Sequence, residues 1–228
     1  MAGQGAGSAN GMNAGAQAVA AVVAVGGLLG GAWAFYEIEE NLPRYDGPAV
    51  CSAQEDEELP AGYLSGPQLC EALNRPDLPA LLGTPGEQAL AAGGGVAWST
   101  PLGGTKIATP GANVQLTTYS MKLSASYDPL SVTDMADLLG LGAQKTTVLG
   151  RPAVLSSDRT IAVTFDHGKT GTGPGGIARR LIVAKDVRDT GGSYEVVIWR
   201  EDGRLPDDAA LLRAAEGVLP AIPGWSAG

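Results

Sequence analysis

The chain of 228 residues is long enough for one ordinary domain with its own core. Only 5% of the residues are aromatic, whereas 34 are glycine and 15 are proline, which predicts long loops. The net charge of −9 argues against a nucleic-acid partner, because phosphate backbones attract basic surfaces.

The first stretch with a clear pattern runs from Ala16 to Tyr36 and contains no charged residue. As a helix it extends roughly 30 Å, the thickness of the hydrocarbon core of a bilayer, which predicts one transmembrane helix over 16–36. Residues 1–15 are small and polar without a pattern, which indicates a disordered tail. Gly26 and Gly30 have the spacing of closely packed helix pairs and suggest a homodimer.

Two other interpretations of this segment stay open. Ala32-Trp33-Ala34 has the form of a signal-peptidase site, so cleavage after Ala34 would give a secreted protein. In the second interpretation, the segment is a buried helix of a soluble fold. A retained helix fits better than a signal peptide, because no lysine or arginine precedes Arg44. It predicts a single-pass protein of the cell membrane with its C-terminal domain outside.

Residues 37–60 carry most of the charge, since eight acids and one base between Glu37 and Glu58 give −7. Like charges and prolines keep a segment extended, which predicts an acidic stalk over 37–60. The run from Glu55 to Glu58 lacks the spaced ligands and the turn glycine of a calcium loop, so we predict no metal site there.

Cys51 and Cys70 are the only cysteines. In an oxidising exterior they are expected to pair, which would close a loop of about twenty residues. The alternative is a buried Cys70 and a free Cys51. No lipobox precedes Cys51, so we do not interpret it as a lipid-modified residue.

Residues 61–228 are predicted to form one extracytoplasmic domain. Short links between successive strands indicate antiparallel pairing. The expected fold class is α+β, an antiparallel sheet packed with helices and preceded by one transmembrane helix. We expect helices near 66–73, 77–82, 87–92, 131–139 and 209–219, and strands at 114–126, 146–155, 160–165, 178–187 and 193–201.

A glycine-rich segment follows the 160–165 strand and contains Gly-Lys-Thr at 168–170. A phosphate loop needs a glycine where Val163 stands, so a hairpin loop fits better. His167 is the only histidine, and we find no catalytic constellation, no metal site and no cofactor motif. Asp166, His167 and Lys169 remain a possible ligand loop.

A resemblance rests on three segments: Gly62-Tyr63-Leu64-Ser65-Gly66-Pro67-Gln68-Leu69-Cys70, Leu73-Asn74-Arg75-Pro76-Asp77-Leu78-Pro79 and Leu81-Leu82-Gly83-Thr84-Pro85. These segments resemble uncharacterised membrane-anchored domains of actinomycetes, a family of unknown function. The order of elements is more distantly similar to the PsbP-like domains of exported lipoproteins, although this chain lacks their lipobox. The resemblance implies topology and fold and transfers no catalytic residue.

The function expected from these observations is that of a non-catalytic binding or interaction module of the cell envelope, with a protein or small molecule as its partner. The first alternative is an envelope enzyme of unrecognised type that uses Asp166, His167 and Lys169. The second is a scaffolding protein that associates through Gly26 and Gly30.

Overall fold

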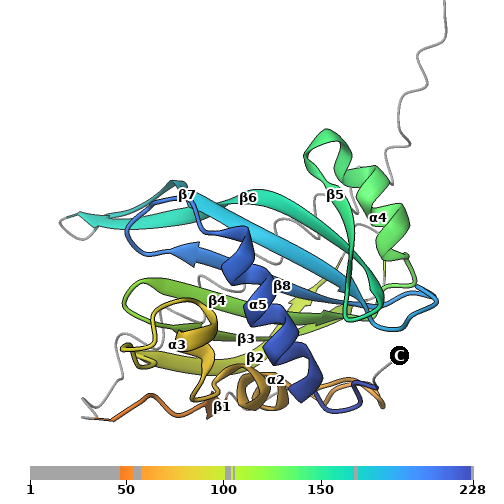
Figure 1. The fold of residues 1–228 in the computed structure, drawn as a ribbon, viewed down its shortest axis with the longest axis horizontal. Coiled ribbons are helices and arrows are strands. Elements are labelled where there is room, and N and C mark those ends of the chain that lie inside the picture. Colours follow the sequence, from red (N-terminus) through yellow and green to blue (C-terminus); the bar gives the residue numbers. More distant parts are fainter. Residues whose placement is uncertain (1–46, 54–57, 101–103, 105, 167–168, 227–228) are drawn as a thin grey trace, which may run out of the picture.

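The computed structural model describes residues 47–53, 58–100, 104, 106–166 and 169–226 (Figure 1). One eight-stranded sheet dominates them, with the strand order β1-β2-β3-β4-β8-β7-β6-β5. Every neighbouring pair is antiparallel except β1 and β2, which run parallel. The strands are β1 (Ser52–Ala53), β2 (Ala91–Ser99), β3 (Ile107–Gln115), β4 (Tyr119–Ser126), β5 (Gln144–Val148), β6 (Arg151–Asp166), β7 (Lys169–Ala184) and β8 (Ser193–Arg200).

The helices are few and short. They are α2 (Gly66–Leu73), α3 (Leu78–Leu81), α4 (Val132–Leu139) and α5 (Asp208–Val218), with 3-10 turns at Gly140–Gly142 and Leu219–Ala221. Helix α2 begins where the sequence predicts, because the Ser65 hydroxyl accepts from the Gln68 amide and the Gln68 side chain accepts from the Ser65 amide. Helix α5 begins after Asp207, whose carboxylate accepts from the Ala209 amide.

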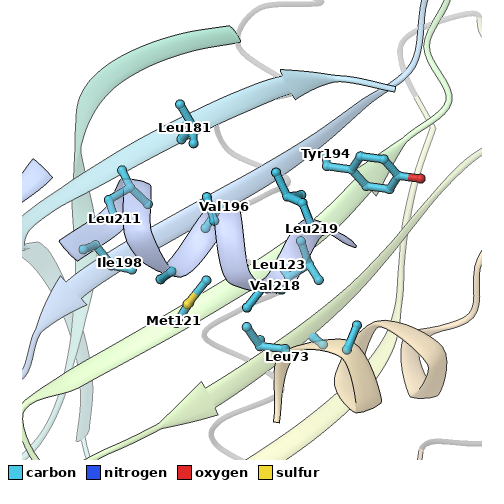
Figure 2. Close-up of a cluster of buried hydrophobic side chains, with 14 of the residues drawn as sticks. Leu73, Met121, Leu123, Leu181, Tyr194, Val196, Ile198, Leu211, Val218 and Leu219 are labelled. Carbon is cyan, nitrogen blue, oxygen red and sulfur yellow. The ribbon is translucent and has the colours of Figure 1, made fainter. Parts of the chain in front are cut away.

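The main core lies between one face of the sheet and helices α2, α3 and α5, and Figure 1 shows α5 crossing this face. Alternate residues of β4 and β8 point toward the helices, including Leu123, Val196 and Ile198, which are fully buried. Figure 2 shows that Leu73 of α2 and Leu211 of α5 approach these side chains from the helix side. Burial of this apolar surface is the main favourable term in the folding of the domain.

The opposite face of the sheet carries α4 at one corner. Val132, Met135 and Ala136 of α4 form a second, smaller core with Val154 of β6 and Ile182 of β7. A residue from the β7–β8 connection also holds the helix, because the Asp189 carboxylate accepts from the backbone amides of 132 and 133 at 2.7 and 2.9 Å. A carboxylate is favourable at the N-terminal end of a helix, because the first backbone N–H groups there have no hydrogen-bond partner within the helix.

The expected fold class, an α+β domain preceded by a transmembrane helix, is wrong. The structure is mainly an antiparallel sheet with few helices. No helix in the described part of the chain is long and apolar enough to cross a bilayer. The predicted span at 16–36, the tail at 1–15 and the residues of the expected stalk before 47 lie outside the described residues.

The errors in the expected elements come from glycine and from tight turns. The helical piece expected at 87–92 is wrong, because β2 begins at Ala91 and continues through the three glycines at 93–95. The single strand expected at 114–126 is two strands, β3 and β4, which pair around a turn at 116–118. The strand expected at 146–155 is likewise a hairpin, in which Leu149 and Gly150 both have positive φ.

The predicted disulfide between Cys51 and Cys70 is confirmed, with a Cα–Cα distance of 5.9 Å. It joins the segment before β1 to α2. The end of the expected stalk therefore belongs to the sheet, since Ser52 pairs with Gly93 and Ala53 with Gly94. The side-chain amide of Asn74 also donates to the carbonyl of Ala49 at 2.8 Å.

Candidate functional site

The candidate site lies on the face of the sheet opposite the main core, beside the corner that α4 covers. Side chains alternate between the two faces along a strand, so the residues between the core positions of β3, β4, β8 and β7 share this face. They are polar at its centre, and most are buried or half-buried. We call this surface the polar face and define it by Asn113, Ser120, Lys122, Ser124, Ser156, Arg180 and Glu195.

The strand register places these residues in rows. Asn113 of β3 is opposite Lys122 of β4, which is opposite Val197 of β8, and Val197 is opposite Arg180 of β7. Arg180 is in turn opposite Ser156 of β6. One row of the sheet therefore carries a basic side chain on each side of Val197, Lys122 on β4 and Arg180 on β7.

Arg180 is the most deeply placed charge on the polar face, because its residue is only 5% exposed. Its Nε donates to the Ser156 hydroxyl at 3.2 Å. One terminal nitrogen lies 3.6 Å from a Glu195 oxygen and 3.7 Å from an Asp158 oxygen. These distances exceed the 2.7–2.9 Å of a charge-assisted hydrogen bond. The guanidinium is thus neutralised by two acids without a close bidentate pair.

Lys122 is half-buried beside Arg180 and Glu195. Burial lowers the pKa of its ammonium; the charge of Glu195 acts in the opposite direction, and the positive charge of Arg180 lowers the pKa further. Ser124 donates to the same Glu195 carboxylate at 3.2 Å. The polar face therefore combines two cations and a shared carboxylate in surroundings that solvent reaches only in part.

The side chain of Asn113 has an oxygen atom without a hydrogen-bond partner in the described structure. The residue is 6% exposed, and within the described structure its buried Oδ1 has no hydrogen-bond partner. A buried acceptor without a donor costs about 1–3 kcal/mol. Asn113 is opposite Lys122 in the register, so the unsatisfied oxygen belongs to the row that carries both cations.

A second cationic cluster lies at the end of the sheet and on the core side. Arg151 is 2% exposed, its guanidinium lies 3.4 Å from the centre of the Trp225 ring, and it donates to the carbonyls of Lys185 and Ser226. Burial lowers the pKa of this guanidinium. These contacts fasten the C-terminal segment to the sheet, so we interpret the cluster as structural.

The residues predicted as a ligand loop lie elsewhere. Asp166 ends β6 and Lys169 begins β7, and the two are paired in the register, whereas His167 lies outside the described residues. Most of the expected glycine-rich loop is strand, because β7 runs from Lys169 through the glycines to Ala184. Among the described residues, no group of three or more histidines, cysteines or acids is placed to hold a metal ion.

Sequence reasoning missed the polar face, although one of its strands carries a visible signal. In β8, Glu195 and Trp199 alternate with the apolar core positions Val196 and Ile198. This alternation predicts a second face for that strand. The partners on β3, β4 and β7 depend on the register, which a single sequence does not show.

The model of a family of unknown function, DUF6215, matches residues 9–142, which is more than half of the chain. The match runs from before the predicted span to the 3-10 turn that follows α4, and it therefore includes Asn113 and Lys122. No curated protein and no solved structure matches the chain. The expected resemblance to a family of unknown function is confirmed in this form, but its actinomycete and PsbP-like aspects find no support.

Proposed function

The chain belongs to DUF6215, a family of unknown function, and we propose that its C-terminal domain is a non-catalytic binding module that works outside the cytoplasm. The polar face is its binding surface, and the ligand is a small polar molecule. The observation that carries this proposal is the row of Asn113, Lys122 and Arg180, in which two cations and an unsatisfied oxygen share one face of the sheet.

The place outside the cytoplasm is supported by the disulfide. Cys51 and Cys70 are the only cysteines, and they are bonded to each other. Such bonds persist in oxidising compartments and are rare in the cytosol. Membrane attachment through 16–36 and pairing at Gly26 and Gly30 concern residues outside the described structure, and both stay predictions.

The non-catalytic role is supported by the chemistry of the polar face. In the described part of the polar face, serines donate to carboxylates or accept from arginine, and no histidine or cysteine stands beside them as a base or nucleophile. The alternative of an enzyme that uses Asp166, His167 and Lys169 stays a prediction. Of these residues, Asp166 and Lys169 lie at the far end of the β6–β7 pairing, away from Arg180 in the register.

The proposal predicts that a small polar ligand stabilises the protein through Arg180. Thermal unfolding is measured with four separate mixtures: organic acids, amines, amino acids and neutral sugars. One mixture is expected to raise Tm by roughly 5 °C or more when its active member exceeds its Kd about a hundredfold. The shift should disappear in Arg180→Gln and in Lys122→Met.

Arg213→Gln is the matched control, because Arg213 is an exposed arginine on α5, a helix of the core side. It should keep the full shift. If no mixture raises Tm, or if the shift survives in both polar-face variants, the polar face is not the binding surface.

A further inference from the structure

We propose that the outer edge of β6 is an interaction surface for a second copy of this chain. In the dimer, residues 161–165 of the two copies lie side by side as antiparallel strands, with Val163 on the twofold axis. The two sheets then join into one continuous sheet. This pairing is independent of the polar face and of its ligand.

One edge of β6 lacks a neighbouring strand over most of its length. Strand β5 is the last strand of the sheet, and it pairs with β6 only from Arg151 to Leu155. In the described part of the chain, no strand pairs with this edge from Ser156 to Asp166. An edge strand presents a row of backbone N–H and C=O groups, which is a template for pairing with another chain.

The far half of the β6–β7 hairpin is a ribbon of only two strands. Strand β8 pairs with β7 from Ala178 to Ala184, whereas the pairing of β6 with β7 continues as far as Asp166 and Lys169. Figure 1 shows the hairpin extending past the ends of β4 and β8. A two-stranded ribbon by itself is marginally stable in water, so an added strand would stabilise this one.

The sequence of this edge lacks the residues that usually protect an exposed strand. Natural edges carry lysine, proline or another charged residue, or a bulge bends them away from a partner. Residues 161–165 read Ile-Ala-Val-Thr-Phe and include neither a charge nor a proline. The register shift of β6 lies between Arg159 and Ile161, at the start of this segment rather than within it. β-Branched and aromatic residues of this kind favour strands.

The segment is also complementary to itself. Two identical antiparallel strands have their twofold axis perpendicular to the sheet, so residues opposite each other share a face and are an even number of positions apart. With Val163 on the axis, Ile161 is opposite Phe165 of the second copy, and Ala162 is opposite Thr164. Pairs of a β-branched and an aromatic residue stabilise antiparallel strands. This symmetry favours a second copy over an unrelated strand as the partner.

The neighbouring registers are less favourable. An axis one residue earlier, at Ala162, would bring the irregular backbone at 159–161 into the paired region. An axis one residue later, at Thr164, would place the Asp166 carboxylate opposite Ala162. The axis at Val163 pairs all five uncharged residues with one another.

The first test is disulfide crosslinking of the full-length protein. Both native cysteines are bonded to each other, so an introduced cysteine is the only free thiol. Val163→Cys should form a covalent dimer under mild oxidation, because Cα atoms of opposite residues are about 4.5–5.5 Å apart. Ile161→Cys is the matched control and should not crosslink, because the two copies of this residue would be roughly 14 Å apart.

The second test is sedimentation equilibrium of the full-length protein in a mild detergent, at roughly 1 μM to 1 mM, a range that covers weak to moderate affinities. Val163→Lys should weaken dimerisation at least tenfold, because two like charges would be opposite each other on the axis. Val163→Thr should retain it. A dimer held through Gly26 and Gly30 would not respond to either substitution.

Three results would overturn the proposal. The first is a wild type that stays monomeric over this range, and the second is a dimer that Val163→Lys leaves unchanged. The third is crosslinking of Ile161→Cys as fast as that of Val163→Cys.

Discussion

Gly66→Ala and Gly94→Ala are each expected to lower the free energy of unfolding by about 3 kcal/mol or more, because either Cβ would overlap backbone atoms. A Cβ on Gly66 would collide with the Gly94 and Gly95 backbone, and a Cβ on Gly94 would collide with the Gly66 carbonyl. The colliding atoms belong to the first turn of α2 and to β2, so neither side can move away without separating the helix from the sheet.

Urea denaturation measures this effect, and Gly86→Ala is the control. Gly86 is exposed and does not need a positive φ, and a Cβ added to it would meet no other atom within 4 Å. Its replacement should change the free energy of unfolding by less than about 0.5 kcal/mol. If Gly66→Ala and Gly94→Ala change the free energy of unfolding as little as Gly86→Ala does, the backbone of α2 does not pack directly against the backbone of β2.

Loss of the disulfide is expected to cost about 3 kcal/mol in the double variant Cys51→Ala, Cys70→Ala. The two cysteines are separated by 19 positions, and a loop of this length gives a cost of that size when the bond acts by restricting the unfolded chain. Cys70 is also fully buried in the main core, so the variant removes packing there as well.

The wild type and the double variant are compared by urea denaturation with and without a reductant. The reductant should destabilise the wild type by a similar amount and leave the double variant unchanged. A wild type that is equally stable after complete reduction would contradict a stabilising role of the bond.

The sequence predicts the elements whose signals are local. The helices expected near 66–73 and 131–139 are present as α2 and α4. In the structure the Ser65 hydroxyl accepts from the Gln68 amide, and the Ser131 hydroxyl accepts from the Asp134 amide. The last helix is found from its apolar periodicity and from its acids, which are the cap Asp207 and Asp208 in the first turn. Each of these signals lies within four residues of the structure that it specifies.

The misplaced elements depend on partners far away in the chain. The glycines at 93–95 look like a loop in isolation, yet they continue β2 because β3 pairs with them along the whole strand and α2 needs the space above them. The glycines of β7 are likewise held in a strand by β6. The polar face was missed for the same reason, since Lys122 and Arg180 are 58 positions apart in the sequence and share a row only through β8.

The central claim is that the polar face is the functional surface of this domain, and NMR mapping of backbone amides during titration with the stabilising ligand tests it most directly. The expected result is a set of shifts confined to β3, β4, β7 and β8 around Lys122, Val197 and Arg180. Shifts centred instead on the Asp166–Lys169 end of the hairpin, or on Arg151 and Trp225, would contradict the claim.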